Sequence, residues 1–161
     1  METSAHTHHA SHTSAAAGGS WSGAARATLH CLTGCAIGEV LGLVVGTALG
    51  LSTGATVALA IALAFLFGYA LTLTPVLRSG VALKAALAVT FAADTVSITV
   101  MELVDNSVML LVPGAMDAGL TSILFWGTLA FSLAVAFVLT VPVNRWLISR
   151  GRGHAVVHAF H

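Results

Sequence analysis

The stretch ATLHCLTGCAIGEVLGLVVG, residues 27–46, decides the fold class. It is apolar and continues to Gly50, which makes it long enough to cross a hydrocarbon layer about 30 Å thick as one helix. The whole sequence shares this character, because 57% of its 161 residues are hydrophobic and only 7% are charged. Soluble domains carry about a quarter charged residues. The composition therefore predicts a protein built for lipid.

Three further apolar stretches follow the first and have the length of membrane helices. After the first span, at 27–50, we expect spans at 55–77, 82–112 and 120–143. Trp126 and Trp146 lie near the two ends of the last span, where indole rings favour the membrane interface. The sequence therefore predicts an all-α fold, a polytopic membrane four-helix bundle that occupies residues 24–150.

The basic residues predict the orientation of this bundle. All six lie before the first span, between the second and third, or after the fourth: Arg26, Arg78, Lys84, Arg145, Arg150 and Arg152. The positive-inside rule then places both termini in the cytoplasm, with the lipid bilayer of the inner (plasma) membrane around the spans. The formal net charge is zero at pH 7, so there is no field to attract nucleic acid, and we expect no such partner.

The two ends of the chain differ from the spans. Residues 1–23 are rich in Ser, Thr, Ala, Gly and His without any apolar period, which predicts a disordered tail. Residues 151–161 form a His-rich segment, expected in the cytoplasm, in which a helix would place His154, His158 and His161 on one side. Two interpretations of that segment stay open: metal ligands, or an amphipathic helix at the lipid headgroups.

The first span carries a glycine at every fourth position. These residues are Gly34, Gly38, Gly42, Gly46 and Gly50. A ridge of small residues lets another helix approach closely and pack by van der Waals contact. The partner helix is either in the same chain or in a second copy.

The first span also carries a polar stripe. Cys31, Cys35 and Glu39 follow one another at intervals of four residues and therefore share a face, with His30 beside them. The spacing puts the two cysteine Cβ atoms about 6 Å apart, too far for a disulfide. An ionisable group near the bilayer middle is costly and normally faces the bundle interior with a partner.

The third span supplies the expected partners in DTVSITVMELVDNSVM, residues 94–109. On a helix, Asp94, Met101 and Asp105 share one direction, and Glu102 lies at the edge of the same polar face. We expect Asp94 at a depth similar to that of Glu39. Two carboxylates that lie close together must share a proton or hold a cation between them.

These polar residues favour a ligand site. Thiolate and imidazole are the donors that Zn²⁺ and Cu⁺ prefer. The first functional hypothesis is therefore binding or transport of copper or zinc by His30, Cys31, Cys35, Glu39, Asp94, Met101, Glu102, Asp105, His154 and His158.

Several alternatives stay open beside the metal hypothesis. The chain is alternatively a structural or accessory bundle, which forms a homo-oligomer through the glycine ridge or joins a larger membrane complex. It is alternatively a proton-coupled carrier of a small solute, or the polar residues serve structure alone. No nucleophile–base triad or phosphate-binding loop is present, so we expect no enzyme.

Three runs of sequence carry a family resemblance. They are ATLHCLTGCAIGEVLGLVVG, AADTVSITVMELVDNSVMLLVPGAMDAGL and FWGTLAFSLAVAFVLTVPVNRWLISRGRGHAVVH. Together with the span between the first two, they resemble a prokaryotic membrane family known as domain of unknown function four-three-nine-six, over residues 24–158. The resemblance implies an integral membrane domain and brings no established activity, so it assigns no site residues.

Overall fold

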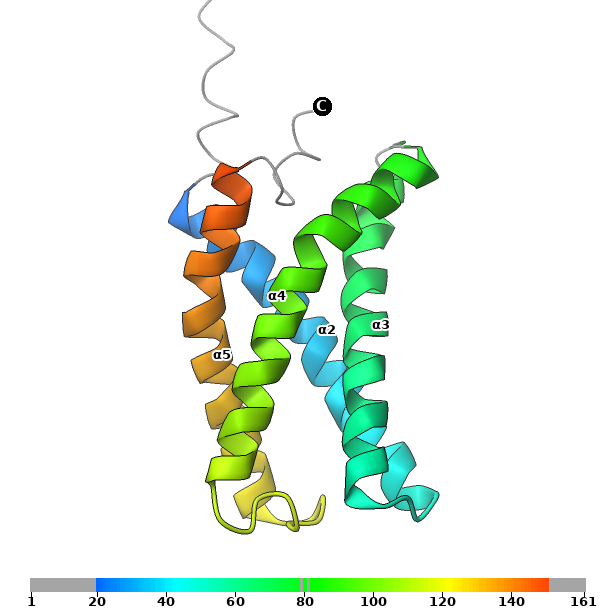
Figure 1. Ribbon diagram of the computed structural model, residues 1–161, viewed down its shortest axis with the longest axis vertical. Coiled ribbons are helices and arrows are strands. Elements are labelled where there is room, and N and C mark those ends of the chain that lie inside the picture. The colour runs from blue at the N-terminus through cyan, green and yellow to red at the C-terminus, as the bar shows by residue number, and fades with distance from the viewer. Residues whose placement is uncertain (1–19, 79, 81, 151–161) are drawn as a thin grey trace, which may run out of the picture.

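The computed structural model describes residues 20–78, 80 and 82–150. These residues form four α-helices and no strand: α2 (Trp21–Ala48), α3 (Thr53–Arg78), α4 (Leu83–Leu111) and α5 (Ile123–Ser149) (Figure 1). The expected all-α four-helix bundle is thereby confirmed. The N-terminal tail up to residue 19, and the C-terminal segment with His154 and His158, lie outside the described residues.

Two helix ends differ from the expected boundaries. α2 begins at Trp21, inside the stretch expected to be disordered, because the hydroxyl of Ser20 accepts a hydrogen bond from the Gly23 amide at 3.1 Å and caps the helix. α5 continues to Ser149 although Pro142 lies within it. The helix runs on through the polar residues Asn144 and Arg145 beyond the expected end at residue 143, so the end of the apolar stretch did not mark the end of this helix.

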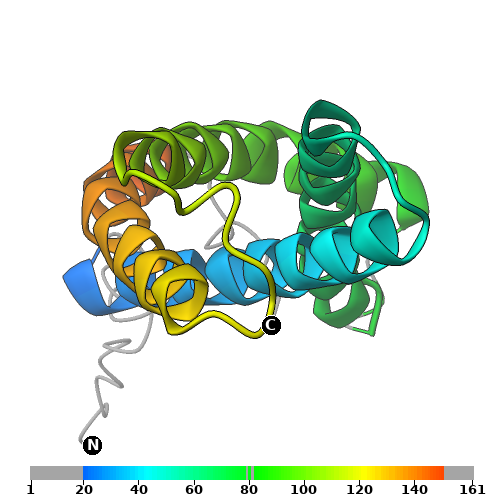
Figure 2. The ribbon, with the colours of Figure 1, turned by 90° about the horizontal axis from the view of Figure 1, so that it is seen from below.

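The helices form a ring in the order α2, α3, α4, α5, which is visible along the bundle axis (Figure 2). Each helix packs against its two neighbours in that ring, and α2 also reaches α4. Seen from the side, α2 crosses behind α4 from the upper end of α5 to the lower end of α3 (Figure 1). This tilt brings the polar stripe of α2 alongside α4.

The glycine ridge of α2 forms the seam with α3. A Cβ atom built on Gly34 would lie 2.6 Å from the Cα of Gly68, and Cβ atoms on Gly38 and Gly42 would collide with Ala64 and Ala60. The ridge is therefore occupied by a helix of the same chain. Of the two partners that the sequence left open, the helix of the same chain is the one that contacts Gly34, Gly38, Gly42 and Gly46.

Three of the four helices are long and apolar enough to cross a membrane: Trp21–Ala48, Thr53–Pro75 within α3, and Ile123–Ser149. The 29 residues of α4 are long enough, but α4 carries Asp94, Glu102 and Asp105 along its length. All three of these side chains are buried. The face that lowers the hydropathy of α4 therefore points at the other helices, as expected for a bundle in lipid.

The cationic residues that the structure describes gather at one end of the bundle. Arg26 lies near the start of α2, Arg78 ends α3, Lys84 is in the first turn of α4, and Arg145 and Arg150 lie at the end of α5. We call this end the basic end. The opposite end, which holds the connections 49–52 and 112–122, is called the loop end.

Candidate functional site

The basic half of the bundle interior is joined by side-chain hydrogen bonds. The amide nitrogen of Asn144 on α5 donates to the Thr28 hydroxyl on α2 at 2.8 Å, and the Ser97 hydroxyl on α4 donates to the amide oxygen of Asn144. All three side chains are buried. One amide thus connects three helices, and each described polar atom in this junction has a partner.

Cys31 and Asp94 form the next polar contact toward the loop end. The Cys31 thiol donates to a carboxylate oxygen of Asp94 at 3.6 Å, and both residues are buried. The sequence led us to expect Glu39 at this depth. Because α2 begins at Trp21, Cys31 lies about 15 Å along α2 and Asp94 about 17 Å along the parallel helix α4, whereas Glu39 lies about 27 Å along α2.

Glu39 instead meets the two acidic residues farther along α4. Glu102 and Asp105 are the ionisable groups with the strongest electrostatic effect on Glu39, and each of the three residues exposes only 5% of its surface. Asp105 accepts a hydrogen bond from Ser132 of α5, and Asn106 donates to Glu102 at 3.4 Å. Neither carboxyl oxygen of Glu39 receives a hydrogen bond from an amide or hydroxyl group. Its polar neighbour is the Asp105 carboxyl group, with which it can form a hydrogen bond only by sharing a proton.

These three carboxyl groups line a cavity of about 360 Å³, which we call the acidic cavity. It extends to the loop end, where the residues of the connections, including Leu51 and Asp117, contribute to its wall. No Lys, Arg or His is present among the described residues that line it. Its volume falls in the range of small-molecule sites, which begins at about 300 Å³.

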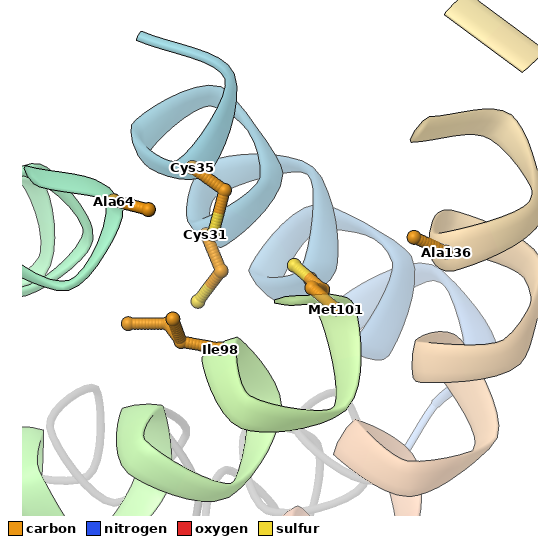
Figure 3. Packing of buried hydrophobic residues seen from close by; sticks show 6 residues of the cluster. All are labelled: Cys31, Cys35, Ala64, Ile98, Met101 and Ala136. Atoms are coloured by element: carbon orange, nitrogen blue, oxygen red, sulfur yellow. The ribbon is translucent and has the colours of Figure 1, made fainter. Parts of the chain in front are cut away.

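A packed cluster lies around the two cysteines. We call it the thiol cluster, and its buried members are Cys31, Cys35, Ala64, Ile98, Met101 and Ala136 (Figure 3). Cys31 contacts Asp94, while Cys35 is close to Glu102 and Glu39. The cluster therefore separates the Asp94 side of the interior from the acidic cavity.

The predicted metal ligands do not come together as one site. Within residues 20–78, 80 and 82–150, no group of three or more His, Cys, Asp or Glu side chains is arranged to hold a metal ion. His30 is exposed, and its Nε2 donates to the Leu71 carbonyl of α3 at 2.9 Å. Met101 is enclosed in the thiol cluster. The residues that do meet form two groups, Cys31 with Asp94, and Glu39 with Glu102 and Asp105, and Cys35 lies beside the second group.

The sequence reasoning missed the contribution of α5. Its buried polar residues are Thr128, Ser132, Thr140 and Asn144. Together with Ala136 they follow one another at intervals of four residues, so they form a stripe on one face. That period was present in the sequence, and it would have identified the hydrogen-bond partners of Asp105 and Ser97.

One protein family is similar to the chain over nearly the whole bundle. A family model described as a domain of unknown function, DUF4396, matches residues 20–153. The chain belongs to this family. The matched DUF4396 region contains all four helices, hence the acidic cavity, the thiol cluster and the Asn144 junction. No curated protein and no solved structure shows significant similarity to the chain.

Proposed function

We propose that this chain is a proton-coupled carrier of a small cation. The proposal rests on Glu39, a buried carboxyl group whose two oxygens receive no hydrogen bond from an amide or hydroxyl group and which lines the acidic cavity with Glu102 and Asp105. A carboxylate removed from water is costly unless a proton or a cation compensates it. A cation from solution that binds at these oxygens therefore compensates their charge and offsets the free-energy cost of burying it.

The charge of the acidic cavity supports exchange rather than permanent binding. Three carboxyl groups at close range cannot all be ionised without a counter-charge, and no basic side chain among the described lining residues supplies one. The counter-charge then comes from solution, as a proton or as another cation. Because both compete for the same oxygens, arrival of one releases the other, which is the basis of proton-coupled exchange.

The lining of the acidic cavity favours a hydrated or organic cation. Its volume of about 360 Å³ exceeds that of a bare ion, and the described carboxylates are not arranged as a metal-ligand group. Cys31 and Cys35 do not line it, and oxygen ligands suit hard cations better than copper. We therefore rank a small organic cation above copper or zinc.

The basic end supports an orientation for this carrier. Five described cationic residues gather there, and the positive-inside rule places such an end in the cytoplasm. The acidic cavity then faces the outside of the inner (plasma) membrane. Uptake of the cation from that side and its exchange for a proton are the expected steps.

The test uses the full chain in liposomes that contain a pH-sensitive dye and an acidic interior. External guanidinium should accelerate proton efflux, and Glu39→Gln should lower that rate by about 100-fold, because the amide binds neither a proton nor a cation in its place. Sodium and Zn²⁺ are tested in parallel. Proton efflux driven by Zn²⁺ alone would support the metal hypothesis instead.

Ser107→Ala is the matched control on α4. Ser107 is exposed, donates to the Leu103 carbonyl of its own helix and does not line the acidic cavity. Its rate should equal that of the unmodified chain. Equal rates for Glu39→Gln and the unmodified chain, or no proton efflux with any cation, would contradict the proposal.

A further inference from the structure

The acidic cavity does not reach the basic half of the bundle. Its described lining includes Glu39, Glu102 and Asp105 but not Asp94, which is fully buried on the other side of the thiol cluster. A carrier that takes protons into the acidic cavity needs a way to pass them onward. The buried groups between the acidic cavity and Asp94 are therefore the place to look for it.

The thiols of α2 bridge this gap. Cys31 donates to Asp94 at 3.6 Å, and one turn farther along α2, Cys35 is close to Glu102. Cys31 and Cys35 lie one turn apart on the same face of α2, with their Cβ atoms about 6 Å from each other, and both belong to the thiol cluster. The four side chains thus form a series from one half of the bundle to the other.

A chain of water molecules through the thiol cluster is not expected to carry the protons instead. Ala64 and Ile98 lie beside the thiols, and Met101 and Ala136 extend the same buried cluster toward α5 (Figure 3). Apolar packing of this kind leaves no polar partners for a chain of waters. In membrane proteins, ionisable groups kept inside such a layer mark functional sites, among them ion pathways and proton relays.

We propose that Asp94 is a second proton-binding site and that Cys31 and Cys35 pass protons between it and the acidic cavity. This inference rests on the proposed function. The Glu102 carboxyl group gives its proton to the Cys35 sulfur, while the Cys35 S–H proton passes to Cys31 and the Cys31 S–H proton passes to the Asp94 carboxylate. One O–H bond breaks at Glu102, one forms at Asp94, both thiols end neutral, and no oxidant or reductant takes part.

The first test separates this inference from the proposed function. In the liposome assay, Asp94→Asn should lower proton efflux driven by guanidinium by about 100-fold, whereas its affinity for guanidinium, measured by calorimetry in mild detergent, should be unchanged. Glu39→Gln should lose both. Normal efflux in Asp94→Asn, with wild-type efflux intact, would overturn the inference and leave the proposed function standing.

The second test addresses the thiols. Cys31→Ala and Cys35→Ala should each lower efflux by at least about tenfold, because alanine carries no transferable proton. Cys31→Ser and Cys35→Ser should restore it, since a hydroxyl both donates and accepts. Thr99→Val is the control on the exposed side of α4, where the hydroxyl only donates to the Thr95 carbonyl.

Folding is checked for every variant by size-exclusion chromatography in mild detergent. Alanine variants that run as a single folded species with wild-type efflux would overturn the relay. If an alanine variant does not fold, the serine variant decides instead. Its efflux in heavy water should slow more than that of the unmodified chain, because an O–H bond loses more zero-point energy on deuteration than an S–H bond does. Identical isotope effects would count against transfer through these side chains.

Discussion

Two buried polar groups, one in each half of the bundle interior, differ in their hydrogen bonds. In the basic half, the amide of Asn144 connects Thr28 and Ser97 through hydrogen bonds. In the loop half, Glu39 is equally buried, yet its oxygens have no such partners and line the acidic cavity. A buried polar group with all its bonds made stabilises a fold, whereas one without them costs free energy. We therefore expect the Asn144 junction to stabilise the bundle, and Glu39 to destabilise it unless a proton or a cation binds.

The seam between α2 and α3 supports both halves, and disrupting its packing should reduce the stability of the bundle more than any other change. Gly38→Ala places a Cβ atom against the backbone of Ala64, and overpacking of this kind costs about 3 kcal/mol or more when neither backbone can move. We expect little folded protein by size-exclusion chromatography in mild detergent.

Gly54→Ala is the matched control for this prediction. Gly54 lies in the first turn of α3 with nothing within 4 Å of an added Cβ atom. Its yield should match that of the unmodified chain. A Gly38→Ala protein as stable as Gly54→Ala would mean that α2 and α3 do not pack along the glycine ridge.

Replacing the central amide of the basic half should have the next largest effect. Asn144→Leu removes the bonds to Thr28 and Ser97, and loss of buried partners costs about 1–3 kcal/mol. Thermal unfolding in detergent should show the lower stability. Asn106→Leu is the comparison, because the bonds of Asn106 stay within α4 and one of them is to the Glu102 carbonyl; it should lose less. An equal loss in both would remove the contrast between the halves.

In the loop half, replacing a buried polar side chain by an apolar one should raise the stability of the bundle instead of lowering it. Glu39→Met replaces a buried carboxyl group that receives no hydrogen bond from an amide or hydroxyl group by an apolar side chain of similar length. Such replacements stabilise proteins by about 1 kcal/mol or more. Thermal unfolding in detergent should therefore occur at a higher temperature, while cation-driven proton efflux is lost. A lower unfolding temperature would show that Glu39 contributes to stability.

The contrast between the halves explains what could be predicted from the sequence. The helices followed from apolar stretches such as 27–46, because lipid imposes one length and one composition on each span. The burial of Glu39 and Asp94 followed as well, since charge avoids lipid. Which acidic residue of α4 lies beside Glu39 could not be predicted, because that depends on where α2 begins and how far it tilts. An error of six residues at the start of a helix shifts the depth of its residues by about 9 Å.

Removing the link between α5 and the acidic cavity should have the smallest effect. Ser132→Ala takes away the hydroxyl that donates to Asp105 at a cost of about 1 kcal/mol. Asp105 then depends more on a bound cation, so guanidinium should bind more tightly by calorimetry, while thermal unfolding without a cation occurs at a slightly lower temperature. The two changes have one cause, because a hydrogen bond from Ser132 and a cation satisfy the same carboxylate. Weaker binding would mean that Ser132 orients Asp105 for the cation rather than competing with it.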